Sequence, residues 1–336
     1  DLIDLGLSYI QIVGFSYIFN GISSIYAGVH RSTEYPAFGT MLFAISMCTN
    51  TFLNYILIFG KFGAPALGVT GAAAATLASR IVEFAVALAY ALRSKRLPFR
   101  TGCILRPGKR IFRSFMRYSL PVVCNETLWS VGFSMLTVIM GHMSNSQDML
   151  AAYALVGNID KLSTVVCFGL AASAAVIVGK EIGEGKSREY IYSVSRTLLL
   201  SSMLVGAAVM AVLLTLLPTF FRPVLFPLFK LSEGAAYAAT CMSLLYACGM
   251  PFRAFDVTNI TGVLRAGGDA RVAALIDVCP LWLAAIPLMA LTALVLEAPV
   301  FIVCLSMQAE NAVKCPLGYL RFRGGKWIND ITRAEM

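Results

Sequence analysis

Charged side chains are scarce in this sequence. Asp, Glu, Lys and Arg make up 13% of its 336 residues, whereas 58% are hydrophobic and the mean hydropathy is +0.75. A soluble domain usually has about 25% charged residues. The scarcity of charge therefore excludes an ordinary soluble domain and indicates an all-α protein that crosses a lipid bilayer several times.

Patterns for metals, disulfides and nucleotides are also lacking. The nine Cys are scattered, mostly in apolar segments, with no C-x-x-C spacing, so we expect small buried residues. The two histidines, His30 and His142, have no third ligand in view. Residues 180–187 resemble a phosphate-binding loop, but Lys180 stands where that motif has Gly, and no strand precedes it. We therefore expect no metal, no ATP use and no cofactor other than a transported ion.

Positive charge is concentrated in residues 93–117. Nine of the 27 Lys and Arg lie there, with no Asp or Glu, and apolar segments flank the stretch on both sides. A short basic loop between two spans stays in the cytoplasm. The basic loop therefore predicts the orientation of the chain in the membrane. The net charge of +9 is explained by cytoplasmic loops of this kind, and we expect no nucleic-acid partner.

Apolar runs of about 20 residues or more predict nine transmembrane helices. They lie at about 6–28, 36–60, 68–92, 118–142, 149–179, 190–217, 236–264, 271–296 and 298–320. Many Gly, Ala, Ser, Thr and Asn in these spans favour close helix packing. We expect prolines at 121, 251, 280 and 287 to break or bend their helices.

The chain contains a weak internal sequence repeat. Gly28-Val-His-Arg31 and Gly262-Val-Leu-Arg265 each end a span, and the same offset of 234 residues puts Arg80 on Lys314. With Asp1 as the first residue and no signal segment, the repeat predicts two sets of six helices, of which three, about 120 residues, precede this chain. Residues 1–92 would complete a first lobe, 93–117 a linker, 118–320 a second lobe and 321–336 a cytoplasmic tail.

Several motifs resemble one transporter family. The run from Asn54 through Gly60-Lys-Phe-Gly-Ala-Pro65 to Gly71 resembles the turn between the fifth and sixth helices of the multidrug and toxic compound extrusion (MATE) family. So do the segments 121–132, 178–185 and 264–269. The resemblance covers nearly the whole chain and implies helices 4–12 of a twelve-helix, two-lobe fold. It also implies export of small organic cations in exchange for Na⁺ or H⁺ by alternating access, and no enzyme activity. We expect a monomer in a bacterial cell membrane.

Glu126 is the first candidate for ion or proton coupling. It lies about 12 Å inside the fourth span at 1.5 Å per residue, and no Lys or Arg lies one turn away. An unpaired carboxylate in apolar surroundings is unfavourable, so it must be protonated, hold a cation or face a wet cavity. If proton, Na⁺ and drug compete for it, binding one releases another. The alternative is a structural acid; the resemblance favours coupling, because the seventh helix of many members carries an important acid.

Asp256 and Asp160 are the other candidates for coupling. Asp256 lies within a span, and Arg253 three residues earlier could neutralise it along one helix face. The resemblance leaves its role open, because family members often carry Asn there. Asp160 and Lys161 interrupt a long span, and since adjacent helical residues point apart, we expect each to pair with another helix.

Further charged residues have the spacing of local ion pairs near the cytoplasmic edge, where they would serve as anchors or gate latches. They are Asp277 with Arg271, Arg80 with Glu83, and Glu310 with Lys314. Polar, aromatic and thioether side chains could line a drug cavity, because aromatic faces attract organic cations and Met adapts to varied shapes. These are Asn125, Trp129, Phe133, Tyr153, Tyr246 and Met250.

Two alternatives remain at this point. A lipid-carrier flippase of a related fold would need a basic cavity for pyrophosphate, whereas the deep acids favour cations. An intramembrane prenyl or acyl transferase would need clustered Asp, or His paired with Asp, near a membrane face, and the sequence has no such cluster.

Overall fold

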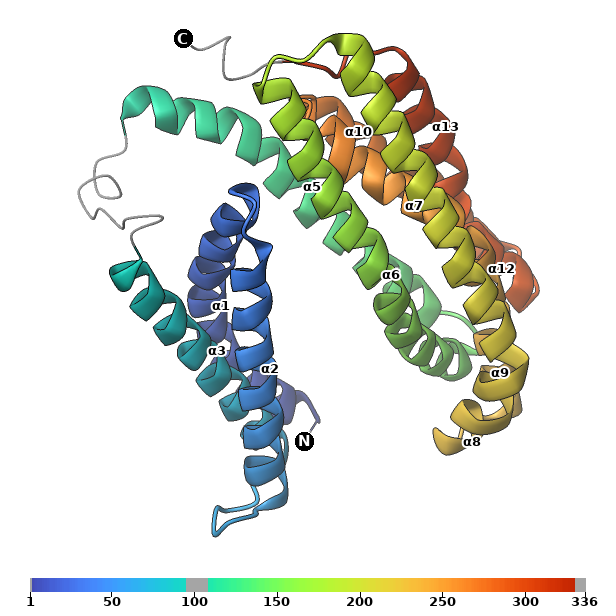
Figure 1. Ribbon diagram of the computed structural model, residues 1–336. Helices are drawn as coiled ribbons and strands as arrows, with labels where there is room; N and C mark the ends of the chain where they lie inside the picture. The colour runs from blue at the N-terminus through green and yellow to red at the C-terminus, as the bar shows by residue number, and fades with distance from the viewer. Residues whose placement is uncertain (1, 95–107, 330–336) are drawn as a thin grey trace. The chain divides into compact units, whose positions relative to one another are not determined.

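The computed structural model describes residues 2–94 and 108–329 (Figure 1). Within these ranges every regular element is a helix, and the chain forms two compact units, Asp1–Gly108 and Lys109–Met336. The division falls inside the predicted basic linker, of which residues 95–107 lie outside the described ranges. The prediction of an all-α membrane fold is confirmed.

The first unit consists of three long helices. They are α1 (Leu2–Ser32), α2 (Pro36–Phe59) and α3 (Gly68–Arg93), and α3 packs against both of the others. The α2–α3 turn needs Gly60, whose φ of 65° is left-handed and ends α2. Gly71 allows α3 to approach α2, because a Cβ there would lie 2.5 Å from the backbone oxygen of Leu57.

The second unit contains the remaining helices, several of which include wider π-helical turns. They are α5 (Lys109–Gly141), α6 (Ser146–Gly183), α7 (Arg188–Leu216) with η1 (Leu217–Leu225) and α8 (Phe226–Leu228), α9 (Glu233–Val257) with η2 (Thr258–Leu264), α10 (Ala270–Pro280), η3 (Leu281–Ala285), α11 (Ile286–Ala290), η4 (Leu291–Val295), α12 (Val300–Met307) and α13 (Ala309–Arg323). Helix α9 packs against both α6 and α7, and α10 packs against α5 and α13.

Eight of the nine predicted spans coincide with helices long and apolar enough to cross a membrane. The ninth, predicted at 298–320, is divided at Gln308 into α12 and α13. Helix α5 begins at Lys109, nine residues before its predicted span, because hydropathy marks only the apolar part of a helix. In the predicted tail, Trp327 is fully buried and its backbone oxygen lies 2.4 Å from a Cβ built on Gly267.

Two of the four prolines mark the irregular turns. Pro280 immediately precedes η3, and Pro287 lies between η3 and η4. Because proline has no N–H to donate, the freed carbonyls favour a local change in helical pitch. Pro121 and Pro251 instead lie inside continuous α-helices, so neither proline breaks its helix.

Small residues let the helices of the second unit approach closely. A Cβ on Gly206 of α7 would lie 2.8 Å from the Ala254 Cβ and from the Met250 backbone oxygen of α9. A Cβ on Gly262 of η2 would lie 2.8 Å from the backbone oxygen of Ala171 in α6. Backbone atoms cannot move aside easily, so these glycines fix how α6, α7 and α9 pack.

Gly206→Ala therefore tests the close approach of α7 to α9. The added methyl should overpack this contact and destabilise the protein by roughly 1–3 kcal/mol. Thermal unfolding in detergent, followed by tryptophan fluorescence, measures the loss. The matched control is Gly169→Ala in α6, where a Cβ meets nothing within 4 Å. The control should be neutral or slightly stabilising, since Ala favours helix over Gly by about 1 kcal/mol. Equal midpoints for the two variants would contradict this packing.

Candidate functional site

The second unit contains a cavity of about 450 Å³ between its helices. Helices α5, α6, α9 with η2, α10, and the junction of α12 and α13 contribute to its wall. Its charged lining residues are Glu126, Asp160, Lys161, Arg253, Asp256, Arg265, Asp277, Glu310 and Lys314.

Two apolar clusters flank the cavity along the helices. On α6, residues 149–156 belong to one buried cluster and Val178 and Ile182 to the other. The α6 residues that line the cavity, 153–168, lie largely between them. On α9 and η2, the residues that line the cavity begin at Tyr246, just after the residues of the first cluster at 238–242. The cavity therefore lies in the middle of the spans, where charge is most expensive.

Glu126 lines the cavity but is not an unpaired acid. Its Oε1 accepts a hydrogen bond from Nη1 of Arg265 at 3.0 Å, and its side chain is 59% exposed. The expectation of a carboxylate without a basic partner is therefore wrong. Spacing along one helix reveals only neighbours on that helix, whereas the partner of Glu126 comes from the end of η2, 139 residues later.

Arg265 belongs to a chain of ion pairs that joins α5, the end of η2, α10 and α13. Its Nη2 lies 3.6 Å from Oδ2 of Asp277, whose Oδ1 lies 2.8 Å from Nζ of Lys314. Lys314 also pairs with Glu310 at 2.5 Å. Asn125 donates a hydrogen bond to Asp277 at 2.8 Å. Lys314 is 4% exposed, so this ammonium is held between two acids with little water.

This arrangement corrects one predicted pair and relocates another. Asp277 pairs with Lys314 and Arg265 and not with Arg271, because its side chain faces the cavity. The Glu310–Lys314 pair is confirmed, but Glu310 begins α13 at the middle of the last span and not at its edge. A role of these pairs as latches stays a prediction.

Arg253 also has a different partner from the expected one. Its Nη1 donates to Oδ1 of Asp160 at 2.6 Å, across from α9 to α6. The predicted Arg253–Asp256 pair is therefore wrong, whereas the prediction that Asp160 pairs with another helix is confirmed. Because Asp160 engages the Arg253 guanidinium, no ion pair joins Arg253 to Asp256 among the described residues.

Asp256 is the buried acid that the ion pairs leave without a partner. It is 3% exposed, it lines the cavity, and neither carboxylate oxygen has a hydrogen-bond partner among the described residues. The amide of Asn259, one turn later, is likewise unpartnered in the described part of the chain. A Cβ on Gly318 of α13 would lie 2.9 Å from Asn259 Nδ2 and 3.9 Å from Asp256 Oδ1. Buried polar atoms of this kind require a proton, an ion or water.

Aromatic side chains form the other part of the lining. Trp129 and Phe133 have ring centroids 4.4 Å apart, and both line the cavity together with Tyr153 and Tyr246. Two predicted lining residues lie elsewhere. Asn125 is buried against Asp277, and Met250 is fully buried beside Cys167 and Ala254.

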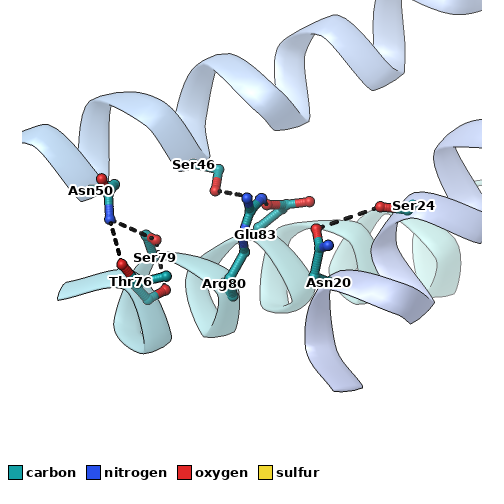
Figure 2. Close-up of polar contacts among 8 residues, drawn as sticks. All are labelled: Asn20, Ser24, Ser46, Asn50, Thr76, Ser79, Arg80 and Glu83. Carbon is teal, nitrogen blue, oxygen red and sulfur yellow. Dashed lines mark hydrogen bonds and ion pairs between the residues drawn. The ribbon is translucent and has the colours of Figure 1, made fainter. Parts of the chain in front are cut away.

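A separate polar network lies inside the first unit (Figure 2). Arg80 pairs with Glu83 at 2.6 Å and lies 3.4 Å from the hydroxyl of Ser46 on α2. The predicted Arg80–Glu83 pair is confirmed, but it lies near the middle of α3 and not near its end. Asn50 reaches Thr76 and Ser79 at 3.5 Å, and Asn20 pairs with Ser24 within α1.

Sequence reasoning missed Arg265 as a member of the site. It ends a predicted span, where a basic residue does not by itself require a partner inside the membrane. The predicted spans contain several acids, and each acid inside a membrane requires a basic partner. This excess of acids is the sequence signal that could have indicated Arg265. Gln308 and Asn311, which line the cavity at the break between α12 and α13, gave no such signal.

Comparison with known proteins gives a consistent result. The MatE family model matches residues 121–291, which is 171 of the 336 residues. The probable multidrug resistance protein NorM of Thermotoga maritima is 25% identical over 83% of this chain and 58% of its own length. The chain thus spans less than two thirds of that relative. The uncharacterized transporter YisQ of Bacillus subtilis is 24% identical over 95% of this chain and 68% of its own length.

A solved structure also matches. The crystal structure of a MATE protein in complex with MaL6 has a TM-score of 0.81 and 17% identity. The match covers 96% of this chain and 70% of that one. At this identity the likeness concerns the fold alone, and it agrees with the all-α architecture described above.

Lys314→Met tests the ion-pair chain. Removing the ammonium leaves Asp277 and Glu310 as neighbouring, poorly hydrated acids, which should destabilise the protein by roughly 3–5 kcal/mol. The control is Lys186→Met, because Lys186 forms an exposed pair with Glu184 at 3.3 Å, which contributes about 0–1 kcal/mol. Thermal unfolding in detergent gives both values. A loss for Lys314→Met no larger than that of the control would mean that the chain of pairs does not hold the fold.

Proposed function

We propose that this chain, which belongs to the MatE family, works in a secondary active antiporter that exports small organic cations in exchange for Na⁺ or H⁺. The single observation that carries the proposal is the unpartnered carboxylate of Asp256 at the cavity wall. Such a cycle makes and breaks no covalent bond in the substrate, so the chain acts as a transporter and not as an enzyme.

The proposed coupling follows from the cost of a buried charge. An ionised carboxylate in a poorly hydrated site is unfavourable unless a cation accompanies it. A proton, a sodium ion or the cationic group of a drug can each satisfy Asp256, and they compete because the site has one charge. Entry of one occupant from outside therefore releases another, which links the ion gradient to export.

Other residues would serve this cycle in distinct ways. The amide oxygen of Asn259, which is buried one turn after Asp256 and has no partner among the described residues, would add a ligand for Na⁺ or hold a water. Glu126 is bound to Arg265, so it can accept a drug cation only when that pair opens. The aromatic rings of Trp129, Phe133 and Tyr246 would hold flat organic cations, with about 1–2 kcal/mol for a desolvated contact.

The alternatives fit the cavity less well. A flippase for a lipid pyrophosphate needs several basic groups that are free to bind phosphate, whereas acids engage three of the four bases of the cavity wall, Arg253, Arg265 and Lys314. An intramembrane transferase needs clustered catalytic groups. In the described residues no group of three or more His, Cys, Asp or Glu could hold a metal ion, and the resemblance of the fold is to transporters.

Ethidium efflux from drug-sensitive bacteria that express the full-length gene product tests the function. Asp256→Asn should reduce efflux to the level of cells without the transporter, because the amide cannot exchange ions. Glu126→Gln should leave efflux that is still driven by the ion gradient, because Asp256 remains. Glu189→Gln, an exposed acid at the start of α7 outside the cavity, is the matched control.

The same assay with and without Na⁺ at fixed pH identifies the coupling ion. Membrane levels of each variant are compared by immunoblot, so that loss of expression is not mistaken for loss of transport. Gradient-driven efflux by Asp256→Asn at the wild-type rate would contradict the proposed role of Asp256. Absence of efflux from cells with normal amounts of the wild-type protein would contradict the function itself.

A further inference from the structure

The charged residues of the cavity wall divide into those that are paired and two that are not. Four acids are engaged by three bases: Asp160 by Arg253, Glu126 by Arg265, and Asp277 and Glu310 by Lys314. One acid and one base remain. They are Asp256 and Lys161, neither of which has an ion-pair partner among the residues that the structure describes.

Lys161 lies where an unpaired ammonium must face water. It is in the middle third of α6 and its side chain is exposed at the cavity. Its neighbour Asp160 cannot compensate it, because Asp160 is bound to Arg253 at 2.6 Å. A lysine directed at lipid from mid-span would be strongly unfavourable, so its presence in the cavity lining is the stable arrangement.

We propose that Lys161 binds the oxyanion of zwitterionic substrates and so determines how tightly the cavity holds them relative to simple cations. The inference rests on the proposed function and assigns a substrate-binding residue to the same cavity. The cationic group of the substrate occupies Asp256 and its carboxylate or phosphate occupies Lys161. No ion pair of the wall has to open for either contact.

The other three bases are poorly suited to this task. Arg253, Arg265 and Lys314 would each have to leave a carboxylate to reach an anion, which exposes an uncompensated buried acid. Lys161, by contrast, has to give up only hydrating water when it binds an anion. Its three rotatable donors on a flexible stem also suit oxyanions at varied positions within a cavity of about 450 Å³, a size typical for drug-like ligands.

A pair of fluorescent dyes tests this assignment. Rhodamine 123 is the methyl ester of rhodamine 110, so the two share an aromatic cation and differ in the presence of a free carboxylate. Their dissociation constants are measured by fluorescence anisotropy with the purified full-length protein, wild type, Lys161→Gln and Lys161→Arg. Ethidium, which has no acidic group, is the third ligand.

Lys161→Gln should weaken binding of rhodamine 110 about tenfold, as expected for loss of one charge-assisted contact. Binding of rhodamine 123 and ethidium should change less than about twofold, since their cationic part contacts Asp256 and the rings. Lys161→Arg should retain the affinity for rhodamine 110, because it keeps the positive charge.

Three results would overturn the inference. An unchanged affinity of Lys161→Gln for rhodamine 110 would show that its carboxylate does not meet Lys161. Equal weakening of both rhodamines would indicate a packing role or a partnership with Asp256 instead. Binding of ethidium and rhodamine 123 by the wild type without binding of rhodamine 110 would reject the zwitterion class while leaving the proposed function standing. If the wild type binds none of the three dyes, the proposed function fails together with the inference.

Discussion

The structure depends on the pairing of charges inside the spans. A membrane interior gives little solvation to ionised groups, so each acid needs a base, a cation or water beside it. The second unit meets this requirement with ion pairs that join α5, η2, α10 and α13 and join α6 to α9. These pairs add to the apolar clusters and close small-residue contacts that hold the helices together, and they leave Asp256 as the buried acid without a partner among the described residues.

The same requirement accounts for the first unit. Glu83 is 1% exposed and is compensated by Arg80 on its own helix, beside the hydroxyl of Ser46. The sequence repeat places Arg80 on Lys314, and each of these bases lies inside a span next to a buried acid. In the first unit the buried acid Glu83 is paired within α3, whereas in the second unit the acids outnumber the bases at the cavity. The buried carboxylate that has no partner among the described residues, Asp256, is therefore in the second unit.

The sequence was sufficient for the helices but not for their partners. Hydropathy is a local property of each run of about 20 residues, so most ends of the spans could be predicted to within a few residues. The pairs of Glu126 with Arg265 and of Asp160 with Arg253 depend on how each helix is rotated against another, which no local spacing encodes. For this reason the first candidate, Glu126, proved to be paired, and the second, Asp256, proved to be the buried acid without a partner. Hydropathy does not predict the break at Gln308 either, because the few polar residues there lie within one long apolar run.

The most direct test of this account is the affinity of the purified full-length protein for ethidium, measured over a range of pH and Na⁺ concentrations. The account predicts that H⁺ or Na⁺ competes with ethidium in the wild type, so that affinity falls as the coupling ion is added. In Asp256→Asn this competition should disappear. Ethidium affinity that is independent of both ions in the wild type, or the same competition in Asp256→Asn, would contradict the claim that one unpartnered carboxylate is shared by ion and drug.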